Sequence, residues 1–188
     1  MHDLSPITAL GQSTASFDEI GRMTIAENPD LSVASVAARL GQEASCQERL
    51  STLLSADPPL PGEALLTDPV SAIWTGADQW MMTASYSDHE NLADEIKLHM
   101  GKTASVTEQS DAWVCFDISG EDLEDLFERL CPVPLRRLAT GAAQRTTIDH
   151  LGCFVILTQS GQVARVLGPR SSAAALHHAV TTAAISIA

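Results

Sequence analysis

The sequence predicts an α+β fold, a double β-α-β plan in which an antiparallel sheet is covered on one face by helices. Two observations lead to this prediction. A strand, a helix, a proline-rich loop and a hairpin follow one another over residues 31–85, and the same order recurs over residues 112–159. The 188 residues are also 45% hydrophobic and 19% charged, which is typical of a globular chain with a substantial core.

Residues 1–30 are rich in Ser, Thr, Gly and Pro and have little periodicity. We therefore expect an extended N-terminal arm there and a single α+β domain over residues 31–188. Such an arm would lie against a partner, and its deletion would leave the domain folded.

The first half of the domain begins with residues 31–39, which favour a strand, although a helix also fits their small residues. Apolar residues at helical spacing predict a helix over residues 42–56. Three prolines exclude both elements over residues 57–62, where we expect a rigid loop. Two β-rich runs around the glycine-containing linker 75–78 predict a hairpin over residues 70–85.

A capping-box pattern over residues 87–90 predicts the start of a helix that runs to Met100 and ends at Gly101. The two segments that follow, residues 104–109 and 112–119, favour strands because they are short, β-rich and partly apolar.

Residues 119–130 carry the clearest helix, with leucines and a phenylalanine on one face and carboxylates crowded into the first turns. Pro132 and Pro134 stop it. A second hairpin is expected over residues 144–158, one more strand over 162–167, and an alanine-rich helix from 171 to 187.

The chain is acidic, with 11 basic and 24 acidic side chains and a net charge of −13. This charge disfavours binding to nucleic acids and anionic membranes, which need a cationic surface. Residues 1–128 carry −18 and residues 129–188 carry +5. Either Arg136, Arg137 and Arg145 pair with the acidic segment within the fold, or an acidic face docks on a larger, basic partner.

The sequence lacks the features of a membrane span and of a secretion signal. Its longest compact apolar run, residues 151–157, is much shorter than the roughly 18 residues that a span needs. The N-terminal residues lack basic and apolar signal regions. We therefore expect a cytoplasmic protein whose cysteines, which form no C-x-x-C pair, are reduced thiols. They are Cys46, Cys115, Cys131 and Cys153.

The histidines and glycines give no catalytic pattern. No H-x-x-x-H or H-E-x-x-H spacing occurs, so solvated or capping roles are favoured over zinc binding. Glycine-rich phosphate-binding motifs and a nucleophile elbow are missing as well. We therefore predict no catalytic, cofactor-binding or metal-binding residue in this chain. The histidines are His2, His89, His99, His150, His177 and His178.

Two polar groups and the cysteines have a structural and a functional interpretation. Glu121, Asp125 and Glu128 share one helical face, but divalent cations usually recruit ligands from several elements, so a solvated face is favoured. Residues 145–147 (Arg-Thr-Thr) begin a strand and could face a ligand, but an arginine that ties the acidic helix to the sheet is favoured. The four cysteines are expected to be small buried hydrophobic residues.

Several segments form an ordered pattern along the chain: Glu27–Arg39, the tryptophan-flanked hairpin Trp74–Met81, Ile118–Gly120 with Leu126, Leu130–Leu135, and then Gly141, Arg145-Thr146 and Pro169–Ser171. In this order and spacing they resemble the γ-subunit family of heterotetrameric sarcosine oxidase, over nearly the whole chain. The helix with its Cys-Pro-Val-Pro end resembles the one shared with the glycine-cleavage T-protein superfamily. Two positions depart from the pattern: Ala77 stands where Pro is expected, and Pro134 stands where Asp is expected, so no polar role is expected there.

The resemblance implies a fold like the folate-binding domain of the T-protein, and a noncatalytic γ-type subunit that supports assembly by docking on the α subunit. Its partners would be the α, β and δ subunits of a sarcosine oxidase. That enzyme demethylates sarcosine to glycine and passes the one-carbon unit to tetrahydrofolate. FAD, FMN, NAD, tetrahydrofolate and zinc would be held by the other subunits and none by this chain.

Other classes of protein stay open at this point. One is a free-standing folate-binding module or one-carbon transferase. Another is the small subunit of a related N-methylglutamate dehydrogenase. A third is an oligomerisation module with no link to amine metabolism.

Overall fold

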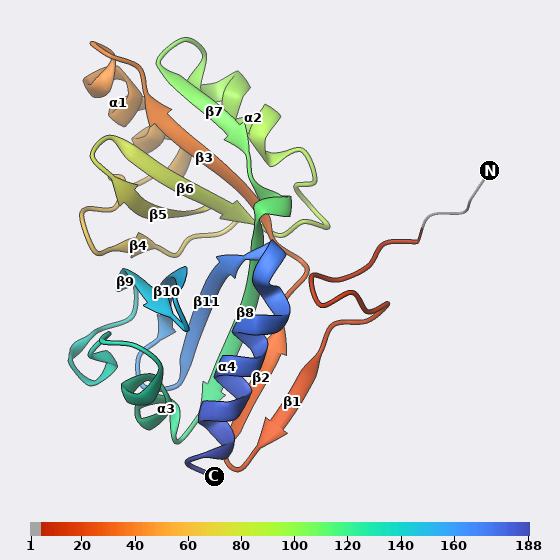
Figure 1. Cartoon of the computed structure of the whole chain (residues 1–188). Helices are drawn as coiled ribbons and strands as arrows, with labels where there is room; N and C mark the ends of the chain where they lie inside the picture. The colour runs from red at the N-terminus through yellow and green to blue at the C-terminus, as the bar shows by residue number, and fades with distance from the viewer. Residues whose placement is uncertain (1–4) are drawn as a thin grey trace. The chain divides into compact units, whose positions relative to one another are not determined.

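The structure is a computed structural model that describes residues 5–188 (Figure 1). Over these residues the chain forms two antiparallel sheets and four α-helices, which confirms the predicted α+β class. The strands are divided between two compact units. We call residues 30–110 with 141–143 the five-stranded unit, and the residues up to 29 with 111–140 and 144–188 the six-stranded unit.

The five-stranded unit contains a sheet with the order β4-β5-β6-β3-β7, in which every neighbouring pair is antiparallel. The predicted strand, helix, loop and hairpin are all present, and β4 is a short addition. The elements are β3 (Ser32–Ala38), α1 (Glu43–Leu54), β4 (Ala64–Leu65), β5 (Ser71–Gly76), β6 (Gln79–Ala84), α2 (Leu92–Met100) and β7 (Ala104–Glu108).

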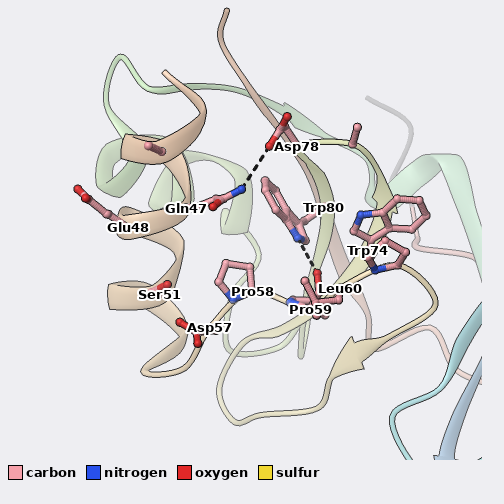
Figure 2. A pocket seen from close by; sticks show the side chains of 13 residues that line it. Gln47, Glu48, Ser51, Asp57, Pro58, Pro59, Leu60, Trp74, Asp78 and Trp80 are labelled. Carbon is pink, nitrogen blue, oxygen red and sulfur yellow. Dashed lines mark hydrogen bonds between the residues drawn. The ribbon is translucent and has the colours of Figure 1, made fainter. Parts of the chain in front are cut away.

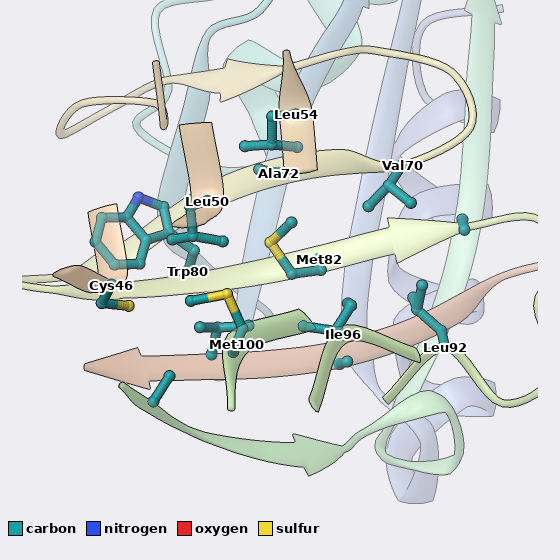
Figure 3. Close-up of a cluster of buried hydrophobic side chains, with 14 residues drawn as sticks. Cys46, Leu50, Leu54, Val70, Ala72, Trp80, Met82, Leu92, Ile96 and Met100 are labelled. Atoms are coloured by element: carbon teal, nitrogen blue, oxygen red, sulfur yellow. The ribbon is translucent and has the colours of Figure 1, made fainter. Parts of the chain in front are cut away.

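Helices α1 and α2 contribute to one hydrophobic core against this sheet (Figure 3). Each helix buries residues four apart, Cys46, Leu50 and Leu54 in α1 and Leu92, Ile96 and Met100 in α2. Because residues four apart share a helix face, each helix has one apolar stripe, and these stripes contact Trp80 and Met82 of β6. Burial of one such side chain contributes roughly 1.5–3 kcal/mol.

The six-stranded unit contains a sheet with the order β1-β2-β8-β11-β10-β9, also antiparallel at the pairs β1–β2, β2–β8, β8–β11 and β11–β10. Helix α4 lies across this sheet (Figure 1). The elements are β1 (Phe17–Ile20), β2 (Met23–Glu27), β8 (Trp113–Gly120), α3 (Leu123–Leu130), β9 (Ala143–Ile148), β10 (Leu151–Gln159), β11 (Val163–Pro169) and α4 (Ala173–Ile185), with short 3-10 turns at Ser110–Ala112, Leu135–Arg137 and Arg170–Ser172.

Two features of this unit follow directly from local sequence. The turn between β9 and β10 consists of Asp149 and His150, both with positive φ (47° and 65°), which is the backbone that a tight two-residue hairpin requires. Leu123, Leu126 and Phe127 of α3 are fully buried, as the helical spacing predicts.

No helix within residues 5–188 is long and apolar enough to cross a membrane.

The expectation of an extended arm over residues 1–30 is wrong for most of that segment. Strands β1 and β2 form a hairpin, and β2 pairs with β8 from Met23↔Gly120 to Glu27↔Phe116. Met23 and Ile25 are 2% and 1% exposed, because alternate residues of β2 point into the core. The Ser and Thr content concealed this short alternation. Residues 5–16 form no helix or strand, and residues 1–4 lie outside the described part.

The capping box expected over residues 87–90 does not form, and α2 begins only at Leu92. The Asp30 carboxylate holds this turn instead, accepting hydrogen bonds from the Ser85 hydroxyl (3.0 Å) and the Ser87 backbone N–H (2.7 Å). Glu90 accepts a hydrogen bond from the Tyr86 hydroxyl. A contact 57 residues away in the sequence therefore replaces the local one, and these hydrogen bonds, the Ser87 N–H first, lower the pKa of Asp30.

Candidate functional site

A groove of about 690 Å³ opens on the five-stranded unit (Figure 2). One side is formed by α1, the floor and opposite side by the two tryptophans of the β5–β6 hairpin, and the end by the proline-rich loop over residues 57–61. All three segments were predicted as elements, but nothing in the sequence indicated that they line one groove.

The proline-rich loop is held against the hairpin by a side-chain hydrogen bond. The indole N–H of Trp80 donates to the backbone carbonyl of Pro59 at 3.2 Å, and both residues are buried (Figure 2). Prolines have no backbone N–H and a fixed φ, so this loop has few alternative conformations. Leu60 projects beside it and is 66% exposed.

Trp74 forms the opposite side of the groove because it is the direct cross-strand partner of Trp80. Partners in a ladder lie on the same face of the sheet, so Trp74 continues the helix-covered face beyond the edge of α1. It is only half-buried. At the hairpin turn, Asp78 has a φ of 54° and accepts a hydrogen bond from the Gln47 side chain of α1 at 3.3 Å.

The charges around the groove are all negative. Glu48, Asp57 and Asp78 line it, and no Lys or Arg is among its lining residues. Within the part of the chain that the structure describes, none of these three carboxylates forms an ion pair. Residues 30–110 as a whole contain 12 acidic and 4 basic side chains, a net charge of −8.

The carboxylates of α3, in contrast, are neutralised within the fold. Arg136 binds Glu124 (2.6 Å), Glu128 (2.7 Å) and Asp125 at once. The interpretation that Arg136 pairs with the acidic segment is therefore confirmed. Of the expected solvated face, Arg136 binds Asp125 and Glu128. Among residues 5–188 no group of three or more His, Cys, Asp or Glu side chains could hold a metal ion.

The other two arginines expected in this role do not take it. Arg145 lies over the ring of Phe154, 5.9 Å from its centroid, and forms no ion pair with the described residues. Arg137 is exposed, also without an ion pair there. The second partner is instead Arg22, which binds Glu121 at 2.7 Å and also Asp122. Arg22 was missed because it lies about 100 residues from its partners and in the segment taken for an arm.

The histidines have structural partners or are exposed. His89 Nδ1 lies 2.8 Å from Glu95, His99 Nε2 is 2.8 Å from the Arg49 carbonyl, and His177 Nε2 is 2.8 Å from Asp18. His150 and His178 are exposed, and His2 lies outside the described residues.

The four cysteines are free thiols, and Cys46, Cys115 and Cys153 are buried as expected, whereas Cys131 is half-buried. Burial raises the pKa of Cys115 to about 12 and that of Cys153 to about 11. These thiols are therefore protonated at neutral pH and are poor nucleophiles.

One polar cluster was not anticipated from sequence. Arg165 of β11 forms a bidentate ion pair with Asp117 of β8. The side-chain amide of Asn28 donates a hydrogen bond to the same carboxylate at 2.9 Å. Asp117 and Arg165 each stand alone in a mostly apolar stretch of sequence, and Asn28 lies between Glu27 and Pro29. Only the strand pairing brings them together.

Solved structures with a similar fold include the following two. A chain of heterotetrameric sarcosine oxidase from Corynebacterium sp. U-96, in complex with pyrrole 2-carboxylate, matches with a TM-score of 0.76 and 19% identity over 87% of this chain and 84% of that chain. The glycine cleavage system aminomethyltransferase T from Bartonella henselae matches with a TM-score of 0.64 and 13% identity. That match covers 86% of this chain and 46% of the longer transferase chain, so this chain spans about half of the transferase.

These similarities define the class of fold, an α+β chain with two antiparallel sheets like the one in the aminomethyltransferase, and they confirm the predicted fold. A particular chain that it resembles over most of its length, with a TM-score of 0.76, is one from heterotetrameric sarcosine oxidase. At 19% identity and below, the comparison shows the fold alone. No protein-family model and no curated protein sequence matches this chain.

Proposed function

We propose that this chain is a noncatalytic, γ-type subunit of a sarcosine-oxidase-type complex and that it supports assembly by docking on the large α subunit. The observation that carries the proposal is the extent of the structural match. With a TM-score of 0.76 it covers 87% of this chain and 84% of a chain of a heterotetrameric sarcosine oxidase, so the two agree over most of both chains. The aminomethyltransferase match uses only 46% of the other chain.

The charged groups of the chain support this role. The carboxylates of α3 and of the turn before it, together with Asp117 and Asp18, are all used in contacts that hold the fold together. Their partners are Arg136, Arg22, Arg165 and His177. Their positions are explained by stability without any substrate. In the proposed cytoplasmic complex the β and δ subunits complete the assembly. FAD, FMN, NAD, tetrahydrofolate and zinc are bound by the other subunits.

The test is a pull-down of the tagged full-length chain from its native host, with the visible spectrum of the eluate recorded. We expect larger chains and flavin absorption bands in the eluate. A colourless eluate that contains this chain alone would contradict the proposal. Reduction of the eluted flavin by sarcosine, compared with reduction by N-methylglutamate, identifies the amine.

The second candidate is a free-standing folate-binding module, and it is favoured by the similarity to the aminomethyltransferase. Titration of the isolated full-length chain with tetrahydrofolate separates the two. Tight stoichiometric binding of tetrahydrofolate supports the folate module. No binding of tetrahydrofolate, together with flavin absorption in the pull-down eluate, supports the subunit.

A further inference from the structure

We propose that the groove beside Trp74 is the docking site for an arginine-bearing, extended segment of a partner polypeptide. This inference rests on the proposed function, because it names the chemistry with which a partner would recognise this chain.

The charge of the groove favours a cationic ligand. Glu48, Asp57 and Asp78 surround the groove, and within residues 5–188 none of them has a cationic partner. The carboxylates of α3 and of the turn before it show the contrast, because Arg136 binds the first group and Arg22 the second. The groove therefore presents uncompensated negative charge, and a guanidinium group is the side chain best suited to bind carboxylates there.

The groove also combines an aromatic ring with exposed apolar surface. Trp74 is half-buried and lines the groove (Figure 2), and an indole is the side chain that attracts a cation most strongly over its face. Leu60, 66% exposed, and Pro58 provide apolar surface for the methylene stem of an arginine. An arginine combines such a stem with a charged end, which the groove carboxylates attract. The same carboxylates would repel an acidic side chain of the partner.

The walls of the groove are rigid. The Trp80–Pro59 hydrogen bond, the prolines of the loop and the Gln47–Asp78 contact fix three sides of the groove before any ligand arrives. A site that is already ordered loses little entropy on binding. Its volume of about 690 Å³ fits a few side chains, which corresponds to a short segment of a partner and not to a domain surface.

The experiment uses the full-length chain with two double variants of equal charge change. Glu48→Lys with Asp57→Lys reverses two exposed carboxylates of the groove, and Asp88→Lys with Asp94→Lys reverses two exposed carboxylates outside it. Thermal unfolding of both variants confirms that they are folded. A third variant, Trp74→Ala, removes the aromatic side of the groove.

Each variant is measured in two ways: recovery of larger chains in the native-host pull-down, and fluorescence anisotropy with a labelled peptide of four Arg-Gly repeats. We expect the groove variants to reduce recovery and to weaken peptide binding by about tenfold. We expect the outside variant to change both by roughly twofold or less. An equal effect of the two double variants, or no effect of the groove variants, overturns the inference.

The failure of this inference is distinguishable from that of the proposed function. If the unaltered chain recovers the larger chains and the groove variants recover them equally well, the subunit proposal stands and the groove proposal falls. If the unaltered chain recovers no larger chain, the proposed function falls, and the peptide measurement alone decides the groove. Displacement of the peptide by methylguanidinium at a similar concentration would assign the groove to a small cation and would overturn the polypeptide segment.

Discussion

Asp117 of β8 and Arg165 of β11 are directly opposite each other in the six-stranded sheet and form two parallel hydrogen bonds, Nε–Oδ1 at 2.7 Å and Nη2–Oδ2 at 2.9 Å. Both side chains are only 27% exposed. A bidentate ion pair at this partly buried position is more strongly coupled than the exposed pairs of α3, because water screens it less.

Arg165→Met should therefore destabilise the chain by about 1–3 kcal/mol, because it leaves the Asp117 carboxylate half-buried and without its cation. Urea unfolding at pH 7 measures this change. The double variant Asp117→Leu with Arg165→Leu should lose less than the two single changes together, since no unpaired charge remains. A single variant as stable as the unaltered chain would refute the coupling.

The Asp18–His177 pair gives a prediction about acid stability. The hydrogen bond from His177, at 2.8 Å, is the main reason why the pKa of Asp18 lies below its ordinary value of 3.8. A carboxyl whose pKa is lower in the folded state stabilises the fold above the unfolded pKa, and this contribution disappears as the pH falls through the folded pKa. The free energy of unfolding should thus decline below pH 3.8 more steeply in the unaltered chain than in Asp18→Asn. Urea unfolding from pH 6 to pH 2.5 tests this, with Glu19→Gln on the same strand as the control.

Gly120 is required where β2 and β8 meet. It has a φ of 136°, and a Cβ there would lie 2.2 Å from the Arg22 carbonyl oxygen and 2.7 Å from the Met23 Cα. Because both atoms belong to the backbone, Gly120→Ala should cost about 2–4 kcal/mol. The control is Gly152→Ala, whose new methyl group meets nothing within 4 Å and should change stability by about 0.5 kcal/mol or less. Equal unfolding midpoints for the two variants would contradict the close approach.

Deletion of residues 1–30 should destabilise the six-stranded unit, contrary to the expectation from sequence. It removes β1 and β2, with the buried Met23 and Ile25, and exposes the edge of β8. Deletion of residues 1–6 removes neither strand and serves as the control. Thermal unfolding followed by circular dichroism compares the two. A cooperative transition at an unchanged temperature in the longer deletion would show that the hairpin contributes little.

The regular elements of the chain could be predicted because their signals are local. Leu123, Leu126 and Phe127 recur at helical spacing and are buried in α3, and the runs on either side of residues 75–78 form the β5–β6 hairpin. A repeat of 3.6 or 2 residues needs no knowledge of distant partners. The same local logic failed at residues 87–90, where Asp30 supplies the contacts that a capping box would have made.

The groove could be predicted only in part. The tryptophans were singled out as part of a resemblance, and the loop was expected to be rigid. The tryptophan hairpin and the proline-rich loop are joined by the hydrogen bond between Trp80 and Pro59, which lie 21 positions apart in the sequence. No periodicity in the sequence encodes a contact of that kind.

The sequence by itself determined the α+β class, the four helices, the hairpins of residues 70–85 and 144–158, and the acidic balance. It left open whether Arg136 pairs with the acidic helix, which the structure settles. Tertiary structure alone decided that Met23 and Ile25 belong to a core and that Arg22 and Arg165 each bind a carboxylate. It also decided that three carboxylates surround a tryptophan-lined groove whose lining residues include no Lys or Arg. The physical reason is the range of the interactions. Helix and hairpin formation depends on neighbouring residues, whereas the pairing of strands and charges depends on which segments burial of apolar surface brings together.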